Sequence, residues 1–123
     1  MLFQYTYKAI LDGRKTTTRR VRKPSDQAVY ADDGRIEAVL VNGREKWRVG
    51  KTYSVQPGRG KPQIARIRIT GIDAENVTDV TNAAARAEGS ADREDFLRLW
   101  VEVNGEANAK ADVWVLHFEL IDE

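Results

Sequence analysis

The stretch Gly13-Arg14-Lys15-Thr16-Thr17-Thr18-Arg19-Arg20 decides how this chain folds, because it joins a helix-ending signal to a strand signal. A short apolar segment, residues 7–11, precedes the glycine. Glycine ends helices readily, since it adopts the left-handed conformation after the last turn at little cost. The three threonines then favour an extended chain, because β-branched side chains suit a pleated strand. The sequence therefore predicts a short helix that turns at Gly13 into a strand.

Alternation along this strand divides its side chains between two faces. The odd-numbered residues from Lys15 to Arg19 should share one face, and the even-numbered residues from Thr16 to Arg20 the other. The eight residues carry four cations, which repel one another unless they are solvated or meet a counter-charge. One interpretation is a basic edge strand that discourages edge-to-edge aggregation. The other is a binding site for an anionic or polar ligand.

Length and composition place the chain among globular proteins. We expect the 123 residues to form a single domain, 1–123, and 41% hydrophobic with 32% charged residues is ordinary for that class. The absence of cysteine excludes a thiolate nucleophile or a thiolate metal site, and the single histidine, His117, argues against a histidine-rich centre. We expect no metal and no cofactor. No apolar run approaches the roughly 20 residues of a membrane span, so we expect a cytoplasmic protein without membrane contact.

The charges are distributed unevenly along the chain. Residues 1–72 carry 16 Lys and Arg against 6 Asp and Glu, whereas residues 73–123 carry 4 against 13. A basic half of this kind suits a nucleotide or polyanion partner. The pI near 8.0 is lower than that of most dedicated nucleic-acid-binding domains.

The hydrophobic patterns predict an α+β fold. Residues 64–72 and 113–120 alternate apolar with polar side chains, as half-buried strands do. Residues 82–88 are rich in alanine and precede Gly89, and a second helix should begin at Asp92 and end at Asn104-Gly105. We expect a mostly antiparallel curled sheet or small barrel with two or three flanking helices. Turn signals predict that residues 24–47 form a peripheral hairpin excursion, a candidate flap over the site.

The motif Gly13-x-Lys15-x-x-Thr18-x-Arg20 resembles the signature of ASCH domains, small relatives of the PUA RNA-binding fold. Many ASCH domains carry Glu where this chain has Thr18. The Lys-Thr-x-Thr version is similar to the bacterial and phage subgroup that includes an N4-acetylcytidine amidohydrolase. Further segments that match the family in the same order are 55–59, 87–89, Phe96 with Trp100, 104–105 and 113–119. The resemblance implies a PUA-like curled sheet with a cleft that runs to the Gly-x-Lys loop.

The resemblance also implies a catalytic trio. Motif matching carries the lysine, threonine and glutamate of the amidohydrolase onto Lys15, Thr18 and Glu88. A lysine has a reference pKa of about 10.4, which burial and neighbouring arginines lower and an adjacent carboxylate raises. A neutral Lys15 would act as a base, and Glu88 would orient it or move a proton. The alternative is a plain Lys15–Glu88 salt bridge between helix and strand.

Two further functions remain open at this stage. The chain is either a binding module that holds RNA or a modified nucleoside without turnover, or a metal-independent ribonuclease with Glu88 as the base. The binding module would hold its ligand in a basic groove with a stacking aromatic, whereas in the ribonuclease Lys and Arg would stabilise the phosphorane-like state. The candidate stacking residues are Tyr30, Trp47 and Tyr53. The candidate ligand-binding residues are Arg14, Arg19, Arg20, Gln56, Arg59 and Lys61.

Overall fold

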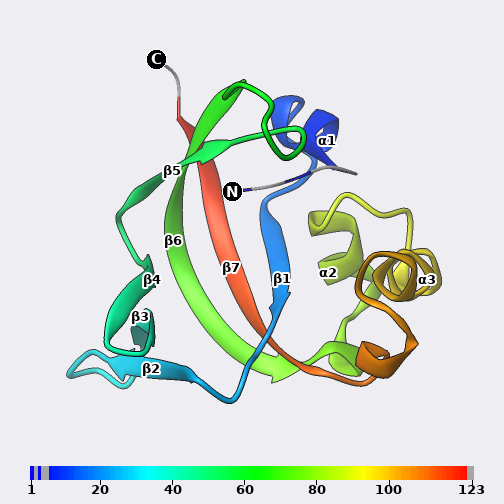
Figure 1. The fold of residues 1–123 in the computed structure, drawn as a ribbon. Helices are drawn as coiled ribbons and strands as arrows, with labels where there is room; N and C mark the ends of the chain where they lie inside the picture. Colours follow the sequence, from blue (N-terminus) through cyan, green and yellow to red (C-terminus); the bar gives the residue numbers. More distant parts are fainter. Residues whose placement is uncertain (2, 4–5, 122–123) are drawn as a thin grey trace.

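We analysed a computed structural model of the chain, which describes residues 1, 3 and 6–121. Seven antiparallel strands form one strongly curled sheet (Figure 1). Its path runs β1-β7-β6-β3-β2, with β4 paired to β3 and β5 paired to β6. The strands are β1 Thr17–Val21, β2 Asp26–Tyr30, β3 Ile36–Val41, β4 Arg44–Arg48, β5 Thr52–Val55, β6 Ala65–Asn76 and β7 Asp112–Ile121. The predicted α+β class with a curled antiparallel sheet is confirmed.

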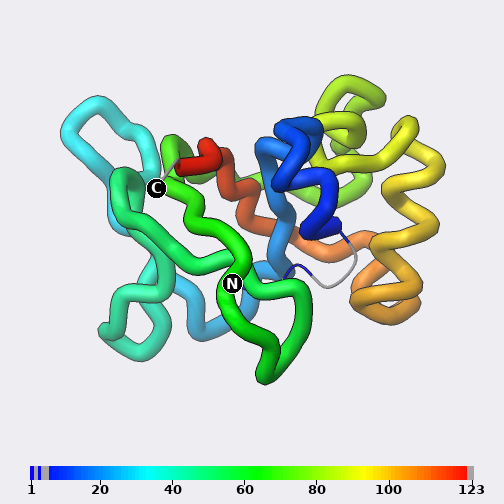
Figure 2. Tube along the Cα trace, turned by 90° about the horizontal axis from the view of Figure 1, so that it is seen from above, coloured from blue at the N-terminus to red at the C-terminus, as the bar shows by residue number. Residues whose placement is uncertain are grey.

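Within the described part of the chain, three α-helices and two short 3-10 helices accompany the sheet. These are α1 Tyr7–Leu11, η1 Val77–Asp79, α2 Asn82–Ala87, α3 Arg93–Asn104 and η2 Glu106–Asn108. Seen from above, α2 and α3 lie on one side of the molecule and the β2–β4 strands on the other, with α1 and β1 between them (Figure 2). No helix among the described residues is long and apolar enough to cross a membrane.

Local sequence signals explain where the helices begin and end. Gly13 follows α1 with φ +80°, and Gly89 follows α2 with φ +96°, both in the left-handed region that favours glycine. Asp92 caps α3, where its carboxylate accepts a hydrogen bond from the main-chain N–H of Asp95. Gly105 ends α3 with φ +88°. These boundaries agree with the predicted ones.

Strand β6 is longer than the pattern predicted, because it continues beyond Ile72 to Asn76. A register shift between Ile69 and Gly71 interrupts its pairing with β7, and the pairing then continues to Asp112. The apolar alternation fades over 73–76, since that end of the strand carries polar side chains. Hydrogen bonds to β7, rather than burial of its own side chains, extend the strand.

Both faces of β7 are buried, which organises the core. Val113 and Val115 pack against Phe96 and Trp100 of α3. On the opposite face, Trp114 and Leu116 pack inside the curl with β3, β4 and β6, and Phe118 packs with Phe3. A strand with its alternate residues in two cores holds the helical layer and the curled sheet together.

The segment 24–47 forms β2, β3 and most of β4. It also contributes to the core, because Val39 is fully buried and Trp47 is 7% exposed, and both pack with Trp114. A single register pair, Ile36 with Ile72, joins β3 to β6. The segment is thus attached to the barrel by side-chain packing more than by strand pairing. Its role as a flap stays a prediction.

Candidate functional site

A cavity of about 600 Å³ lies beside β1, and we call it the β1 cavity. It is bounded by β1, by α3 and η2, by the end of α2, and by residues of β4 and the N-terminal segment. Its lining residues include Lys15, Thr18, Arg19, Arg20, Val21 and Glu88. Others are Phe3, Thr6, Lys23, Lys46, Trp47, Ser90, Phe96, Leu99, Trp100, Val103, Asn104 and Asn108.

Lys15 and Glu88 meet at this cavity although 73 residues separate them in sequence. The Lys15 Nζ donates to the Glu88 carboxylate Oε1 at 3.2 Å and to the Glu88 main-chain oxygen at 3.0 Å. The side chains are only 4% and 5% exposed. The turn at Gly89 makes this contact possible, because a Cβ there would lie 3.1 Å from the Cβ of Ala9. Glycine therefore lets the end of α2 approach α1 and Lys15 closely.

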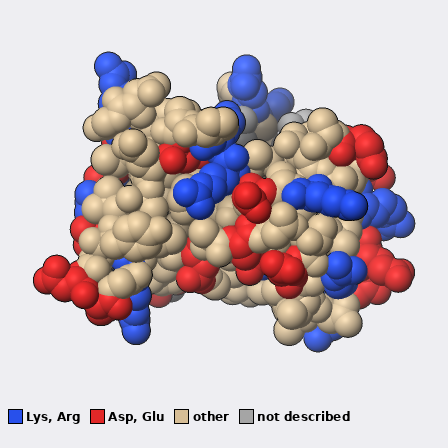
Figure 3. Space-filling view, turned by 90° about the horizontal axis from the view of Figure 1, so that it is seen from below, with Lys and Arg blue, Asp and Glu red and all other residues tan. Residues whose placement is uncertain are grey.

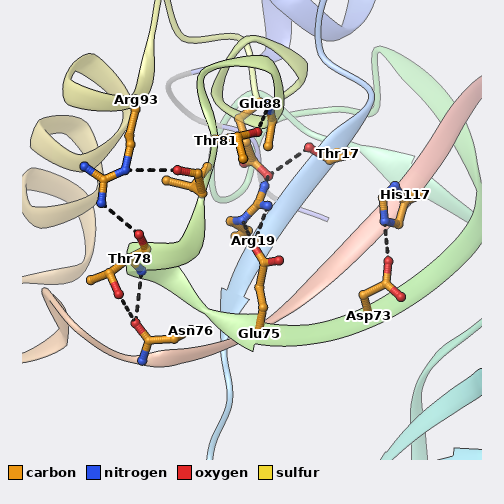
Figure 4. A network of polar contacts seen from close by, with 12 residues as sticks. Thr17, Arg19, Asp73, Glu75, Asn76, Thr78, Thr81, Glu88, Arg93 and His117 are labelled. Atoms are coloured by element: carbon orange, nitrogen blue, oxygen red, sulfur yellow. Dashed lines mark hydrogen bonds and ion pairs between the residues drawn. The ribbon is translucent and has the colours of Figure 1, made fainter.

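The Glu88 carboxylate also receives two hydrogen bonds from β1 (Figure 4). The Thr17 hydroxyl donates to Oε2 at 3.0 Å, and the Arg19 Nη1 donates to the same oxygen at 2.9 Å. Arg19 donates in addition to Glu75 Oε1 on β6, through Nε at 3.0 Å and Nη2 at 2.6 Å. Lys15, Thr17 and Arg19 thus share one face, as the alternation predicted. Together they form a buried network that joins β1, α2 and β6.

Burial decides the protonation tendency of Lys15. Desolvation lowers the pKa of Lys15 below its usual value, and the charges of Arg20 and Arg19 lower it further. The charge and hydrogen bond of Glu88 oppose this shift without reversing it. The pKa of Arg20 is likewise lowered, mainly by burial, with Glu88 opposing. Desolvation therefore outweighs the opposing effect of the Glu88 carboxylate, and Lys15 gives up its proton more easily than a surface lysine.

Thr18 lies on the other face of β1 from Lys15 and Glu88. It is 5% exposed and lines the β1 cavity. No hydrogen bond joins its hydroxyl to another residue of the described chain. Thr17, not Thr18, is the threonine that contacts Glu88. The structure thus brings Lys15 and Glu88 together and leaves the Thr18 hydroxyl available to a ligand in the same cavity.

The predicted binding residues fall into two groups. Arg19 and Arg20 line the β1 cavity, and the Arg20 guanidinium lies 5.2 Å from the centre of the Phe3 ring. Arg14 is exposed and pairs with Asp12 at 2.8 Å. The remaining three belong to the segment that connects β5 to β6 and are not among the cavity-lining residues. They are Gln56, Arg59 and Lys61.

Sequence reasoning missed several lining residues. Lys46 and Lys23 add cations, and Trp47 is the one of the three candidate stacking residues that reaches the cavity. The opposite wall comes from α3, whose apolar stripe pointed only to core packing. Of the lining residues that the structure describes, five are cationic and one is acidic. The cavity therefore favours a ligand with negative charge or several acceptor oxygens.

Although one half of the sequence is basic and the other acidic, the surface of the protein is not divided into one basic and one acidic face. From below, acidic side chains gather over the middle of the face, with lysines and arginines around them (Figure 3). This face therefore carries charges of both signs.

Comparison with known proteins identifies the fold. No family model and no curated protein sequence matches the chain. A crystal structure of a protein from Enterococcus faecalis, of the family DUF984, is similar with a TM-score of 0.60 at 20% identity, over 94% of this chain and 66% of that one. A crystal structure described as an ASCH domain from Lactobacillus crispatus is similar with a TM-score of 0.55 at 22% identity, over 92% of this chain and 68% of that one. This chain spans about two thirds of the length of each. The curled antiparallel sheet, the flanking helices and the Gly13–Arg20 turn into β1 together give this chain the fold of an ASCH domain.

Proposed function

We propose that this chain binds an N4-acylated cytidine, free or within RNA, in the β1 cavity and hydrolyses its acyl amide. The observation that supports the proposal is the buried Lys15–Glu88 pair at the cavity wall. Burial lowers the pKa of Lys15, so this lysine releases its proton more easily than a surface lysine. The Thr18 hydroxyl and the Arg20 guanidinium line the same cavity. An amide hydrolase without metal or cysteine needs a base, an attacking oxygen and an oxyanion donor, and these groups supply all three.

The proposed reaction begins with neutral Lys15, which accepts a proton from the attacking water or from the Thr18 hydroxyl. The activated oxygen adds to the acyl carbonyl carbon, and the Arg20 guanidinium stabilises the oxyanion. The C–N bond then breaks, and the cytosine amine leaves with the proton that Lys15 returns. When Thr18 attacks, water hydrolyses the resulting ester in a second step. The products are the carboxylic acid and cytidine, and Glu88 keeps Lys15 oriented throughout.

The test is incubation of the purified chain with N4-acetylcytidine and chromatographic detection of cytidine. General base catalysis contributes about 10²–10⁴ in rate, so Lys15→Met should lower kcat at least about a hundredfold. Thr18→Val tests the cavity hydroxyl. Thr16→Val is its matched control, because Thr16 is exposed and does not line the cavity. Undiminished activity in a folded Lys15→Met variant would refute this assignment.

Binding of RNA without turnover is the second candidate. The observation that favours it is the excess of cations in the cavity wall, which suits phosphate. Binding that depends on phosphates weakens with salt, with a slope of about −0.7 per phosphate neutralised on single strands. A free nucleoside should bind almost independently of salt. Measuring the affinity of labelled single-stranded RNA between 50 and 200 mM salt, roughly the range over which such slopes are read, separates the two.

A ribonuclease with Glu88 as general base has weaker support. The Glu88 carboxylate already accepts hydrogen bonds from Lys15, Thr17 and Arg19, so both of its oxygens have protein partners and neither is left for a ribose hydroxyl. Cleavage of the labelled RNA in the same experiment would favour this reading over the other two.

A further inference from the structure

The position of the β1 cavity relative to its strand is informative. Four consecutive residues, Thr18–Val21, all line it. Successive side chains of a strand point to opposite faces of a sheet. A cavity over one face would therefore be lined by every second residue only. The β1 cavity must run along the open edge of the strand, where it meets main chain as well as side chains.

Strand β1 is an end strand of the sheet, and its only strand partner among the described residues is β7. The N–H of Phe118 donates to the oxygen of Thr16, and the N–H of Arg22 donates to the oxygen of Asp112, both at 2.9 Å. Hydrogen-bonded residues alternate with non-bonded ones along an antiparallel pair. The even-numbered residues of β1 therefore bond to β7, and the N–H and C=O groups of Arg19 and Val21 point away from β7, toward the cavity.

These main-chain groups form no hydrogen bond to another described residue. Arg19 is nevertheless 7% exposed, so its peptide groups are largely removed from bulk water. Buried peptide groups are nearly always paired. A ligand that supplies a donor and an acceptor at this edge would complete their hydrogen bonding.

We propose that the open edge of β1 at Arg19 and Val21 binds the edge of a nucleobase through main-chain hydrogen bonds. This inference rests on the proposed function, because it names how the same cavity holds the ring of its substrate. One strand residue presents its N–H and C=O on the same side, so each residue offers a donor beside an acceptor. Nucleobase edges carry the complementary pair of groups.

The length of the free edge favours a single ring over an added peptide strand. Arg19 and Val21 lie two residues apart, a rise of about 7 Å at ~3.3 Å per residue. That span accommodates one heterocycle. A typical strand has five or six residues and would extend to about 17–20 Å, well beyond the part of β1 that lines the cavity.

The walls of the cavity suit a flat ring in the plane of the sheet. On the α3 side they are Phe96 and Trp100, which pack with Val115 of β7. On the opposite side of the sheet they are Trp47, which packs with Trp114, and Phe3, which packs with Phe118. A base that continues the sheet from β1 would lie between these two aromatic walls, which provide the stacking surfaces used by single-stranded nucleic-acid readers.

The same placement would bring an acyl group on the base between the two halves of the proposed catalytic site. Lys15 and Glu88 lie on the α3 side of β1, because Lys15, Thr17 and Arg19 share that face. Thr18 belongs to the other face, so in this orientation Lys15 would activate a water molecule on its own side of the amide plane and Thr18 would face the opposite side. Addition to a carbonyl takes place from above or below its plane. The edge-bound orientation therefore presents the acyl carbon to the groups that the reaction requires.

Amide hydrogen exchange of the ¹⁵N-labelled full chain tests this inference. In the free protein, the N–H groups of Arg19 and Val21 should exchange at least tenfold faster than those of Thr18 and Arg20. Saturating cytidine or N4-acetylcytidine should slow Arg19 or Val21 at least tenfold and leave Thr18 and Arg20 within twofold. Ribose 5-phosphate, which lacks a base, should slow neither.

A variant pair supplies a second measurement. Val21→Pro removes the cavity-facing N–H, and proline is tolerated on an edge strand where the N–H does not join the ladder. Val21→Ala keeps the N–H and removes the side chain. Loss of one hydrogen bond should raise the Kd for cytidine by about threefold to tenfold in Val21→Pro relative to Val21→Ala. Equal Kd values, with exchange at Arg19 unaffected by cytidine, would overturn the inference.

The outcomes also separate this inference from the proposed function. Protection of Arg19 or Val21 without deacylation supports the edge and refutes the hydrolase. Deacylation without protection overturns the edge alone. Protection by an extended five-residue peptide, but by neither nucleoside, overturns the inference in favour of strand addition. Absence of binding by both nucleosides overturns both.

Discussion

Replacement of Glu88 by glutamine should destabilise the fold by about 3–5 kcal/mol near pH 6, the usual cost of removing one partner from a buried ion pair. The carboxylate lies 3.2 Å from Lys15 Nζ and 2.9 Å from Arg19 Nη1, and all three side chains are at most 5% exposed. Glutamine preserves the size of the side chain and one acceptor oxygen. It removes the charge and turns an amide donor toward one of the existing donors.

Two features of the structure limit the loss. Arg19 keeps its ion pair with Glu75 at 2.6 Å, and Lys15 keeps its hydrogen bond to the main-chain oxygen of residue 88 at 3.0 Å. Lys15 can in addition release its proton, because burial already lowers its pKa. We therefore expect the lower end of the range, about 3 kcal/mol, wherever Lys15 still carries its charge.

The loss should shrink as the pH rises, and the sign follows from linkage. Between the folded pKa of Lys15 and its unfolded value of about 10.4, the unfolded chain binds more protons, so stability increases with pH. Removal of Glu88 takes away a group that raises this pKa. In Glu88→Gln the pKa of Lys15 in the folded state is then lower still. The stability of the variant therefore begins to rise with pH at a lower pH than that of the original chain, which reduces the difference between them.

Urea unfolding followed by tryptophan fluorescence at pH 6 and pH 9 measures this difference. Glu119→Gln is the matched control, because Glu119 also faces an arginine, Arg68 at 3.3 Å, but with side chains 55% and 45% exposed. Exposed pairs contribute about 0–1 kcal/mol. A loss in Glu88→Gln no larger than that of the control, and equal at both pH values, would contradict the buried network.

Three further substitutions test the frame around the site. Gly89→Ala should cost about 1–3 kcal/mol, because φ +96° strains any L residue and the new Cβ would lie 3.1 Å from that of Ala9; Gly34→Ala, also at positive φ but without a neighbour within 4 Å, is the control for the clash in thermal unfolding. Asp26→Asn should cost about 1–3 kcal/mol at pH 7, because the carboxylate accepts hydrogen bonds from Trp114 Nε1 and the N–H of Lys23. Burial raises the pKa of Asp26, but these bonds and Lys46 outweigh it, so the pKa is lowered overall. The stabilisation by the carboxylate should therefore disappear as the pH falls through the folded pKa. A loss of stability in Asp26→Asn that does not depend on pH would count against the ionised carboxylate. Leu116→Ala should cost about 2–5 kcal/mol, because Leu116 is fully buried beside Trp114; a loss under 1 kcal/mol by urea unfolding would contradict the packing inside the curl.

Local signals in the sequence were sufficient for the elements that border the site. Gly13 and Gly89 mark helix ends because each needs a positive φ, and Asp92 marks a helix start because its side chain caps. The period of two along 15–20 predicted that Lys15, Thr17 and Arg19 share a face. Each of these signals acts within a few residues, so no knowledge of the distant chain is needed to interpret it.

The parts that could not be predicted depend on contacts between distant segments. The proximity of Lys15 to Glu88 came from a family resemblance, since nothing local relates residues 73 positions apart. The contribution of Trp47 to the cavity depends on how β4 folds back on the curl. The contact between Thr17 and Glu88 could have been predicted, because the alternation of the strand places Thr17 on the same face as Lys15. The family motif instead pointed to Thr18. The local pattern thus predicted where the side chains lie, and the family motif suggested which of them take part in the proposed chemistry.

The presence of both Arg19 and Lys15 on one carboxylate argues that the network does more than hold β1 to α2. As a structural link, Arg19 alone would suffice, since it bonds to Glu88 and Glu75 at once and so joins three elements. Arginine remains charged at any ordinary pH, whereas a buried lysine can lose its proton. Lys15 adds a hydrogen bond to the main-chain oxygen of residue 88 at 3.0 Å, at a cost in desolvation. It also contributes an amine that can exchange a proton beside a cavity, which Arg19 cannot do, and the proposed hydrolysis requires such a group.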